Sequence, residues 1–158
     1  MGNRNVAGDY DKKPSAKSAV LTVSDQLLKE TVAILCREKV FPKRSRWIIA
    51  EPIVSIVNKY HTFVSYANGI HVVDHATFAE RYKAQTLAIA WHYALNVKMT
   101  AAQLILDAPI DAFDHWQRIW NRAKDLTYAW RNSDRKRFEE KFSSLSADEL
   151  KGSSISSP

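Results

Sequence analysis

The sequence predicts an all-α protein, an antiparallel up-down-up-down four-helix bundle. Three observations predict this fold. Apolar residues recur at helical spacing in several stretches, the connections between these stretches are short, and no alternating pattern is long enough for a sheet. The chain has 158 residues, of which 46% are hydrophobic and only four are glycine. This length and composition suit one domain with a sizeable core.

Composition divides the chain into three segments. Residues 1–22 are polar, with glycines and several lysines, and are expected to form a disordered basic arm. Residues 23–142 carry the apolar patterns and are expected to form the bundle domain. Residues 143–158 are rich in serine and are expected to be a disordered tail.

The first helix is expected over residues 24–39. Its apolar face should comprise Leu27, Leu28, Val32, Ile34 and Leu35. Pro42 should end this segment, because proline disfavours a helical conformation for the residue before it. Ser45 is positioned to cap the next helix by accepting a hydrogen bond from a free N–H of its first turn.

The second helix, expected over residues 45–68, has the most regular pattern in the chain. Its apolar stripe should comprise Ile49, Ile53, Ile56, Val57, Tyr60, Phe63, Val64 and Ala67. Pro52 predicts either a kink or a first turn that restarts near Glu51. Gly69 suits a left-handed C-cap.

The third helix is expected over residues 76–97, with Thr77 and Glu80 as a capping box. One apolar stripe should comprise Phe78, Tyr82, Thr86, Ile89, Ala90, Tyr93 and Val97. A second apolar face should comprise Leu87, Trp91 and Ala94. Either this helix is buried on two sides, or the second face contacts another subunit.

The fourth helix is expected to start at Thr100, which forms a capping box with Gln103. The segment 107–109 contains Pro109 and should kink or interrupt it. The inward side beyond this point should comprise Phe113, Trp116, Ile119, Trp120, Ala123, Leu126, Thr127 and Trp130. The charged segment that follows, with Phe138 and Phe142, is compatible with a helical extension.

Basic residues give the main functional signal. The formal net charge is +6 and the pI is about 9.5, which favours an anionic partner such as nucleic acid. A solvated basic surface without a partner is the alternative. The candidate phosphate-binding residues are Lys43, Arg44, Arg46, Arg118, Arg122, Arg131, Arg135, Lys136 and Arg137.

Motifs for catalysis are not recognisable in the sequence. His71 and His75 are the best metal candidates, but they bracket a loop, so a capping or surface role is favoured over a metal site. Cys36 is the single cysteine, which excludes an intramolecular disulfide. No apolar run suggests a membrane span or a signal peptide. We therefore expect a cytoplasmic protein that is not an enzyme, with neither metal nor cofactor.

Several short patterns resemble a known family. They are the turn Phe41-Pro42-Lys43-x-x-Arg46-Trp47, the segment Tyr82-Lys83-Ala84, the segment Asn96-Val97-Lys98-Met99-Thr100, and Trp120. Residues 23–130 resemble the accessory variability determinants (Avd) of diversity-generating retroelements. These are related to bundle proteins encoded in intervening sequences of ribosomal RNA genes. Pro52 and Pro109 depart from the continuous helices of that family.

The resemblance implies a function as well as a fold. Retroelement members of the family are barrel-shaped homopentamers that bind a reverse transcriptase and structured RNA of the template-repeat region, and they support mutagenic cDNA synthesis without a catalytic site of their own. A structural or interaction bundle of unknown partner, as in the ribosomal intervening-sequence relatives, is the alternative. If the resemblance holds, Leu87, Trp91 and Ala94 are the expected oligomer contacts.

Overall fold

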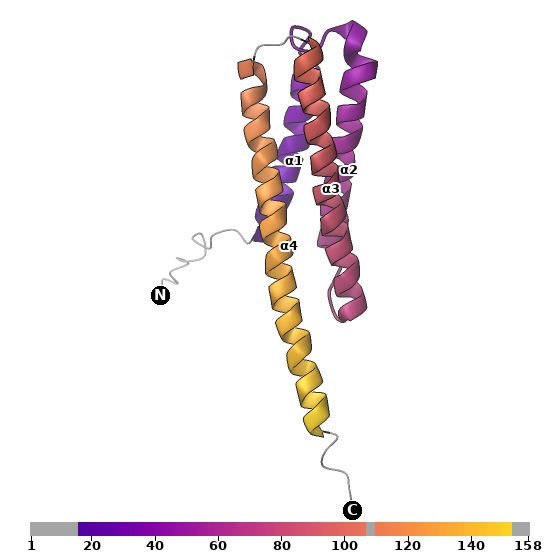
Figure 1. The fold of residues 1–158 in the computed structure, drawn as a ribbon, viewed down its shortest axis with the longest axis vertical. Helices are drawn as coiled ribbons and strands as arrows, with labels where there is room; N and C mark the ends of the chain where they lie inside the picture. Colours follow the sequence, from indigo (N-terminus) through magenta and orange to yellow (C-terminus); the bar gives the residue numbers. More distant parts are fainter. Residues whose placement is uncertain (1–15, 107–109, 153–158) are drawn as a thin grey trace, which may run out of the picture.

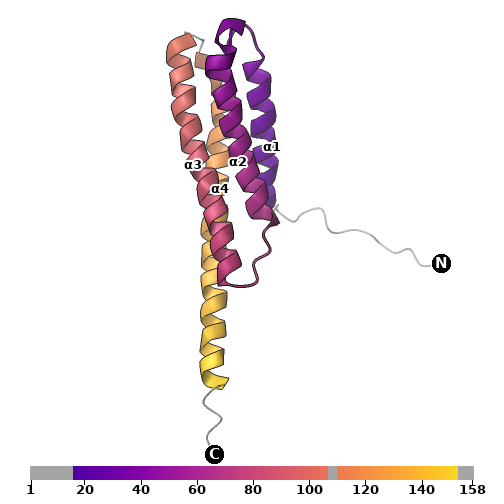
Figure 2. The same ribbon diagram turned by 90° about the vertical axis from the view of Figure 1, so that its right-hand side faces the viewer.

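The computed structural model describes residues 16–106 and 110–152, and these residues form helices without a strand. The four long helices are α1 (Ala16–Leu35), α2 (Glu51–Gly69), α3 (His75–Leu106) and α4 (Ile110–Gly152). They lie side by side along their lengths, with α2 against α1 and α3, and α4 against the same two helices (Figures 1 and 2). The predicted all-α class is confirmed.

The ends of the helices define two poles of the molecule. The end of α1, the start of α2, the end of α3 and the start of α4 lie at one pole, whereas the α2–α3 loop lies toward the other (Figures 1 and 2). Helix α4 continues past that loop and is the longest of the four (Figure 1). The two poles therefore present different sets of side chains.

Helix α1 begins earlier than predicted, within the segment expected to be disordered. Val20 and Val23 are buried, so the apolar face starts before residue 24. One series of buried positions in α1, at alternating spacings of four and three residues, comprises Val20, Ser24, Leu27, Thr31 and Ile34. Val32 was expected in the core but is 45% exposed. A polar serine and threonine at core positions had obscured the correct face.

The segment between α1 and α2 differs from the predicted capped turn. Ser45 does not cap a helix, because its hydroxyl donates instead to the carbonyl oxygen of Pro42 at 2.9 Å. A 3₁₀ turn (η1, Lys43–Ser45) leads into a π-helical turn (η2, Arg46–Ala50) before α2 starts. Pro52 is the second residue of α2, which directly follows the π-helical turn. The predicted restart near Glu51 is therefore confirmed.

The connection from α2 to α3 is capped by residues other than those predicted. Gly69 is the last helical residue of α2, and extended Ile70 follows it, so no left-handed glycine cap forms. Asp74 caps α3, since the Thr77 N–H donates to Asp74 Oδ1 at 2.8 Å. The hydrogen bonds from Thr77 lower the pKa of Asp74. Glu80 bonds the Tyr66 hydroxyl instead of a helix end.

Helix α3 buries a different face from the one predicted. One series of buried positions, again four and three residues apart, comprises Arg81, Gln85, Ala88, His92, Leu95, Met99 and Ala102. Ala84 and Ile89 are also buried, and of these Ile89 belonged to the predicted stripe. Tyr93 and Val97, which were expected in the core, are exposed. Small and polar residues thus occupy much of the true core face, beside Ile89, Leu95 and Met99. The helix also continues through Thr100 and Gln103 to Leu106, so the predicted cap there is wrong.

Helix α4 buries nearly the whole predicted stripe, from Phe113 to Trp130, with Leu126 half-buried. The helix then continues through the charged segment to Gly152, beyond the boundary expected at residue 142. Phe138 and Phe142 form a second apolar cluster with Val72 of the α2–α3 loop and Phe78 of α3. This cluster explains why the extension holds to the bundle after the main core ends.

Hydrogen bonds from aromatic side chains connect the core across the helices. The Trp116 Nε1–H donates to Thr31 Oγ1 on α1 at 2.8 Å. The Tyr60 hydroxyl lies 2.8 Å from Thr127 Oγ1 and 3.2 Å from the Ala123 carbonyl on α4. Burial raises the pKa of Tyr60 to about 12, so the phenol stays neutral. These bonds fix the packing of α4 against α1 and α2.

We expect Trp116→Ala to lower the free energy of unfolding by about 3–5 kcal/mol, because it removes a side chain that is 1% exposed and leaves Thr31 without its donor. Trp47→Ala is the matched control, since Trp47 is 70% exposed and its loss should change stability by less than about 0.5 kcal/mol. Urea unfolding followed by circular dichroism measures both. Equal midpoints for the two variants would contradict the packing described here.

Candidate nucleic-acid interface

The basic turn between α1 and α2 contains both exposed and folded-back cations. Lys43 and Arg44 are exposed. Lys43 Nζ lies 3.9 Å from a carboxylate oxygen of Glu38, and both side chains of this ion pair are exposed to solvent. Arg46 is half-buried, and its Nη2 donates to the Cys36 carbonyl at 3.3 Å. It therefore satisfies a carbonyl beyond the end of α1 and does not project from the turn as expected. Of the three candidate cations in this turn, Lys43 and Arg44 are the exposed ones.

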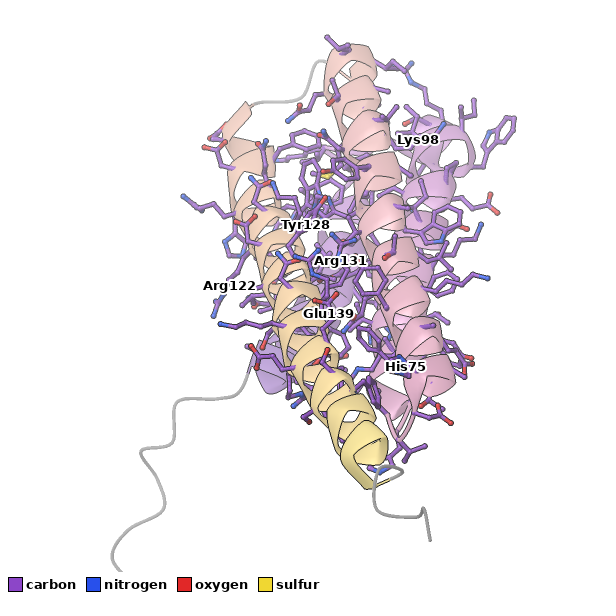
Figure 3. All side chains as sticks on the ribbon, turned by 60° about the horizontal axis from the view of Figure 1, so that its bottom comes forward. His75, Lys98, Arg122, Tyr128, Arg131 and Glu139 are labelled. Carbon is purple, nitrogen blue, oxygen red and sulfur yellow. The ribbon has the colours of Figure 1, made fainter. Side chains whose placement is uncertain are left out.

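The outward face of α4 carries a row of three exposed cations, Arg118, Arg122 and Lys136. Arg118 and Arg122 are one turn apart and exposed, and Figure 3 shows Arg122 pointing away from α3. Lys136 is also exposed. It lies 18 residues after Arg118, which makes five full helical turns and about 27 Å along the axis. Among the side chains that the structure describes, these three cations have no carboxylate within ion-pair distance.

Arg131 does not join this row. Its guanidinium lies over the rings of Tyr82 and Tyr128, at 5.4 and 5.1 Å, and its Nη1 donates to Thr86 Oγ1 at 3.3 Å. Figure 3 shows Arg131 between α3 and α4. Arg131 thus connects the two helices, while its neighbour Arg135 is exposed to solvent.

Arg137 belongs to a buried polar cluster that the sequence did not reveal. Asp134 is buried, and its Oδ2 accepts hydrogen bonds from Arg81 Nη2 at 2.8 Å and Gln85 Nε2 at 2.9 Å. Arg137 Nη2 reaches the other carboxylate oxygen at 2.9 Å. One carboxylate therefore serves two guanidinium groups. A signal was present, because an arginine at a core-spaced position such as Arg81 requires a buried partner.

The two histidines considered as metal ligands have separate surroundings. His71 is exposed in the α2–α3 loop, and the His75 ring packs on Phe142 at a centroid distance of 4.3 Å. Within residues 16–106 and 110–152, no three His, Cys, Asp or Glu side chains are grouped closely enough to hold a metal ion. The same part of the chain contains no helix that is long and apolar enough to span a membrane.

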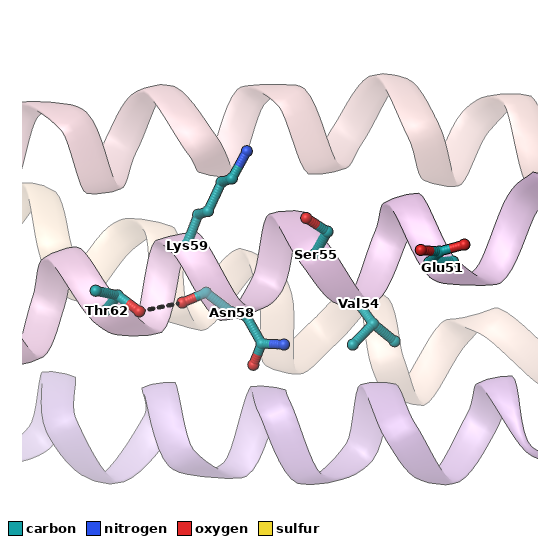
Figure 4. Close-up of a pocket in the computed structure, with 6 residues that line it drawn as sticks. All are labelled: Glu51, Val54, Ser55, Asn58, Lys59 and Thr62. Carbon is teal, nitrogen blue, oxygen red and sulfur yellow. Dashed lines mark hydrogen bonds between the residues drawn. The ribbon is translucent and has the colours of Figure 1, made fainter.

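The face proposed for oligomer contacts is half-covered within the chain. Leu87, Trp91 and Ala94 are partly buried on the α2 side of α3, and Lys59 Nζ lies 4.2 Å from the centre of the Trp91 ring. Figure 4 shows Lys59 extending from α2 toward the neighbouring helix. The sequence pattern had placed this face opposite the core, but it flanks the true core.

Two shallow grooves run along the outside of α2. The first is lined by Glu51, Val54, Ser55, Asn58, Lys59 and Thr62 (Figure 4). The second has a volume of about 380 Å³ and continues toward Trp47, Cys36 and Val32. The large apolar side chains Trp47, Ile48, Val97, Leu104 and Ile105 are exposed, and Leu104 is 81% exposed. None of these exposed side chains was predicted from the sequence to belong to a functional site.

His92 is a buried titratable group in the core. It is 3% exposed, its ring stacks on Trp120 at 5.0 Å, and its Nε2 donates to the Trp120 carbonyl at 3.1 Å. Burial lowers the pKa of His92 to about 4. The imidazole is thus neutral in the folded protein and acts as a packed, hydrogen-bonded side chain.

Comparison with known proteins gave no relatives. A scan against protein-family models found no match, and neither the curated proteins nor the solved structures gave a match.

The buried His92 predicts a dependence of stability on pH. Because its pKa is about 4 when folded and about 6.5 when unfolded, the unfolded chain binds more protons between these values. Stability is therefore fully present above pH 6.5 and falls by roughly 3 kcal/mol as the pH drops toward 4. Urea unfolding between pH 7 and 4.5 measures this loss, which should shrink in His92→Gln.

His115→Gln provides the control for this measurement, because it removes a histidine that is exposed to solvent. Its pH profile should match that of the unmutated protein. An unchanged profile in His92→Gln would assign the acid sensitivity to other groups.

Proposed function

We propose that the protein is a non-catalytic, nucleic-acid-binding accessory subunit of a reverse transcriptase, supporting mutagenic cDNA synthesis in a diversity-generating retroelement. The proposal begins from the resemblance of the Phe41–Trp47 turn and the other matching segments to the Avd family. The observation that carries it is the row of exposed cations on α4, formed by Arg118, Arg122 and Lys136. Lys43 and Arg44 add exposed cations at the pole where α4 begins.

This arrangement supports binding to a phosphate backbone. Lysine and arginine side chains that neutralise phosphates release bound counterions, which gives affinity without reading the base sequence. A row of about 27 Å can contact several phosphates of one strand. Asp125 also lies on α4, where Lys124 pairs with it at 3.7 Å, so its charge is partly balanced. The expected ligand is structured RNA of the template-repeat region, or an RNA–DNA duplex.

The finer features of the proposal follow the family. We propose an antiparallel up-down-up-down bundle that assembles as a homopentamer in the cytoplasm and binds reverse transcriptase through its basic surface. A reverse-transcriptase gene and a near-duplicate repeat beside this gene would support the partner directly. Sequencing of the flanking DNA distinguishes this arrangement from an isolated gene.

A second function, an interaction bundle with a protein partner, has its own supporting observation. The apolar groove between α1 and the start of α2 adjoins the exposed Trp47, while Val97 and Leu104 are exposed on α3. Exposed apolar surface of this kind is typical of protein contacts. A measurement of RNA affinity distinguishes the two functions, because an interaction bundle does not need to bind RNA.

We expect Arg118→Ala with Arg122→Ala to weaken RNA binding and to flatten its salt dependence. Each lost phosphate contact should lower the slope of log affinity against log salt by about 0.7 to 0.9. The same measurement on Lys43→Ala with Arg44→Ala tests the turn separately. Fluorescence anisotropy with a labelled RNA across a salt series measures both slopes.

Lys29→Ala with Lys83→Ala provides a charge-matched control, since both lysines are exposed on other helices. This variant should retain the slope of the unmutated protein. If the unmutated protein binds no RNA at low salt, the interaction bundle becomes the preferred function. If all three double variants lose the same amount of RNA affinity, binding depends on net charge and not on a defined row of cations.

We expect the unmutated protein to sediment as a homo-oligomer and Trp91→Glu to reduce its size. A glutamate at this half-buried site would place a charge in the proposed contact. Circular dichroism should show unchanged helicity, and Leu104→Glu tests the exposed end of α3 in the same way. A monomeric unmutated protein in analytical ultracentrifugation would exclude the pentamer.

A further inference from the structure

A separate cavity of about 420 Å³ lies at the pole that holds the α2–α3 loop. Its lining includes Lys17 of α1, His71 of the loop, Arg81 of α3, and Arg137 and Lys141 of α4. Small-molecule sites typically have volumes of about 300–1,000 Å³, so this space can admit a ligand. Segments far apart in the sequence thus bring cationic side chains to one concave surface.

The charge of this cavity is strongly positive. Lys17, Arg81, Arg137 and Lys141 each carry a positive charge, and Asp134 is the acidic group bonded to two of them. Among the described residues, none of the side chains lining the cavity is acidic. One carboxylate does not balance four cations. A cation is therefore disfavoured here, and an anion is favoured.

Arg81 is a buried cation in the cavity lining with few partners. It is 5% exposed, and its Nε has no hydrogen-bond partner among the described residues. Its Nη1 reaches the Ile70 carbonyl only at 3.4 Å, so Asp134 supplies its one short contact. Burial lowers the pKa of Arg81, and the charge of nearby Arg137 lowers it further, while Asp134 opposes both effects. A second anion would offset this repulsion.

The guanidinium groups are held in place before any ligand binds. Arg81 lies 5.1 Å from the centre of the Trp130 ring, and Arg137 lies 4.4 Å from that of Phe138. Both also bond Asp134, which restricts their rotation. Donors that are already ordered lose little entropy on binding. Arginine forks match the oxygen geometry of phosphate, whereas Lys17 and Lys141 contribute charge.

We infer that this cavity binds a phosphate group, either free phosphate or the terminal phosphate of a nucleic-acid strand. The row on α4 follows a strand backbone, whereas this cavity is concave and takes a single group. The inference stands apart from the proposed function, because inorganic phosphate alone serves as the probe. Failure of RNA binding at Arg118 and Arg122 would leave it intact.

Isothermal titration calorimetry of the full chain tests the inference. We expect saturable binding of inorganic phosphate at low ionic strength, and no comparable binding of acetate or chloride at equal ionic strength. Lys17→Ala with Lys141→Ala should weaken phosphate binding about tenfold, since hydrogen bonds to charged groups are strong. Both lysines are exposed, so circular dichroism should show an unchanged fold.

Lys29→Ala with Lys83→Ala is again the charge-matched control and should bind phosphate like the unmutated protein. Absence of phosphate binding overturns the inference, as does equal binding of acetate. It is also overturned if the Lys17 and Lys141 variant binds phosphate as tightly as the control does.

Two oligoribonucleotides distinguish the sources of the phosphate. They share one sequence, and one has a 5′-phosphate where the other has a 5′-hydroxyl. Tighter binding of the phosphorylated strand, lost in the Lys17 and Lys141 variant, supports a strand terminus as the occupant. Equal binding of the two strands, together with saturable inorganic phosphate binding, supports free phosphate.

Discussion

The buried contact between Arg81 and Asp134 is the constraint on which helix packing near the α2–α3 loop depends. Both side chains are almost fully buried, so neither charge can be left without the other. Removing one partner of such a pair typically costs about 3–5 kcal/mol, because the remaining charge stays uncompensated. Sliding α3 past α4 by one turn would have the same effect. The pair thus fixes the relative register of these helices, and Gln85 adds a hydrogen bond to the same carboxylate.

The sequence predicted α2 and α4 well because apolar residues occupy their core positions almost without exception. From Ile53 to Ala67, and from Phe113 to Trp130, hydrophobicity alone identifies the buried face. Helix α3 is different, since Gln85 and His92 are buried and Tyr93 is exposed. Gln85 and His92 each donate one hydrogen bond to α4, to Asp134 and to the Trp120 carbonyl, and no local pattern reveals these contacts. Long-range hydrogen bonds therefore decided the face that periodicity missed.

The candidate functional surface was predictable only in part, because the surroundings of a cation in the folded protein are not visible in the sequence. Whether a cation is free to bind a phosphate depends on the groups that surround it in the folded protein. Its neighbours along the chain do not reveal these groups. Arg46 turns back to the Cys36 carbonyl, and Arg131 is held by Tyr82 and Thr86, although both look free in the sequence. Conversely, Lys17 on α1 and Arg81 on α3 are far apart in the chain and meet at one cavity.

The π-helical turn Arg46–Ala50 has a consequence for how relatives of this chain should align. A π turn contains one residue more than an α-helical turn spans, so it acts as a single-residue insertion accommodated in place. A related chain lacking one residue here would keep every core position from Ile53 onward in phase. A gap elsewhere in α2 would rotate the following residues by about 100° and expose its apolar stripe. Loss of one residue is therefore tolerated better within this turn than within α2.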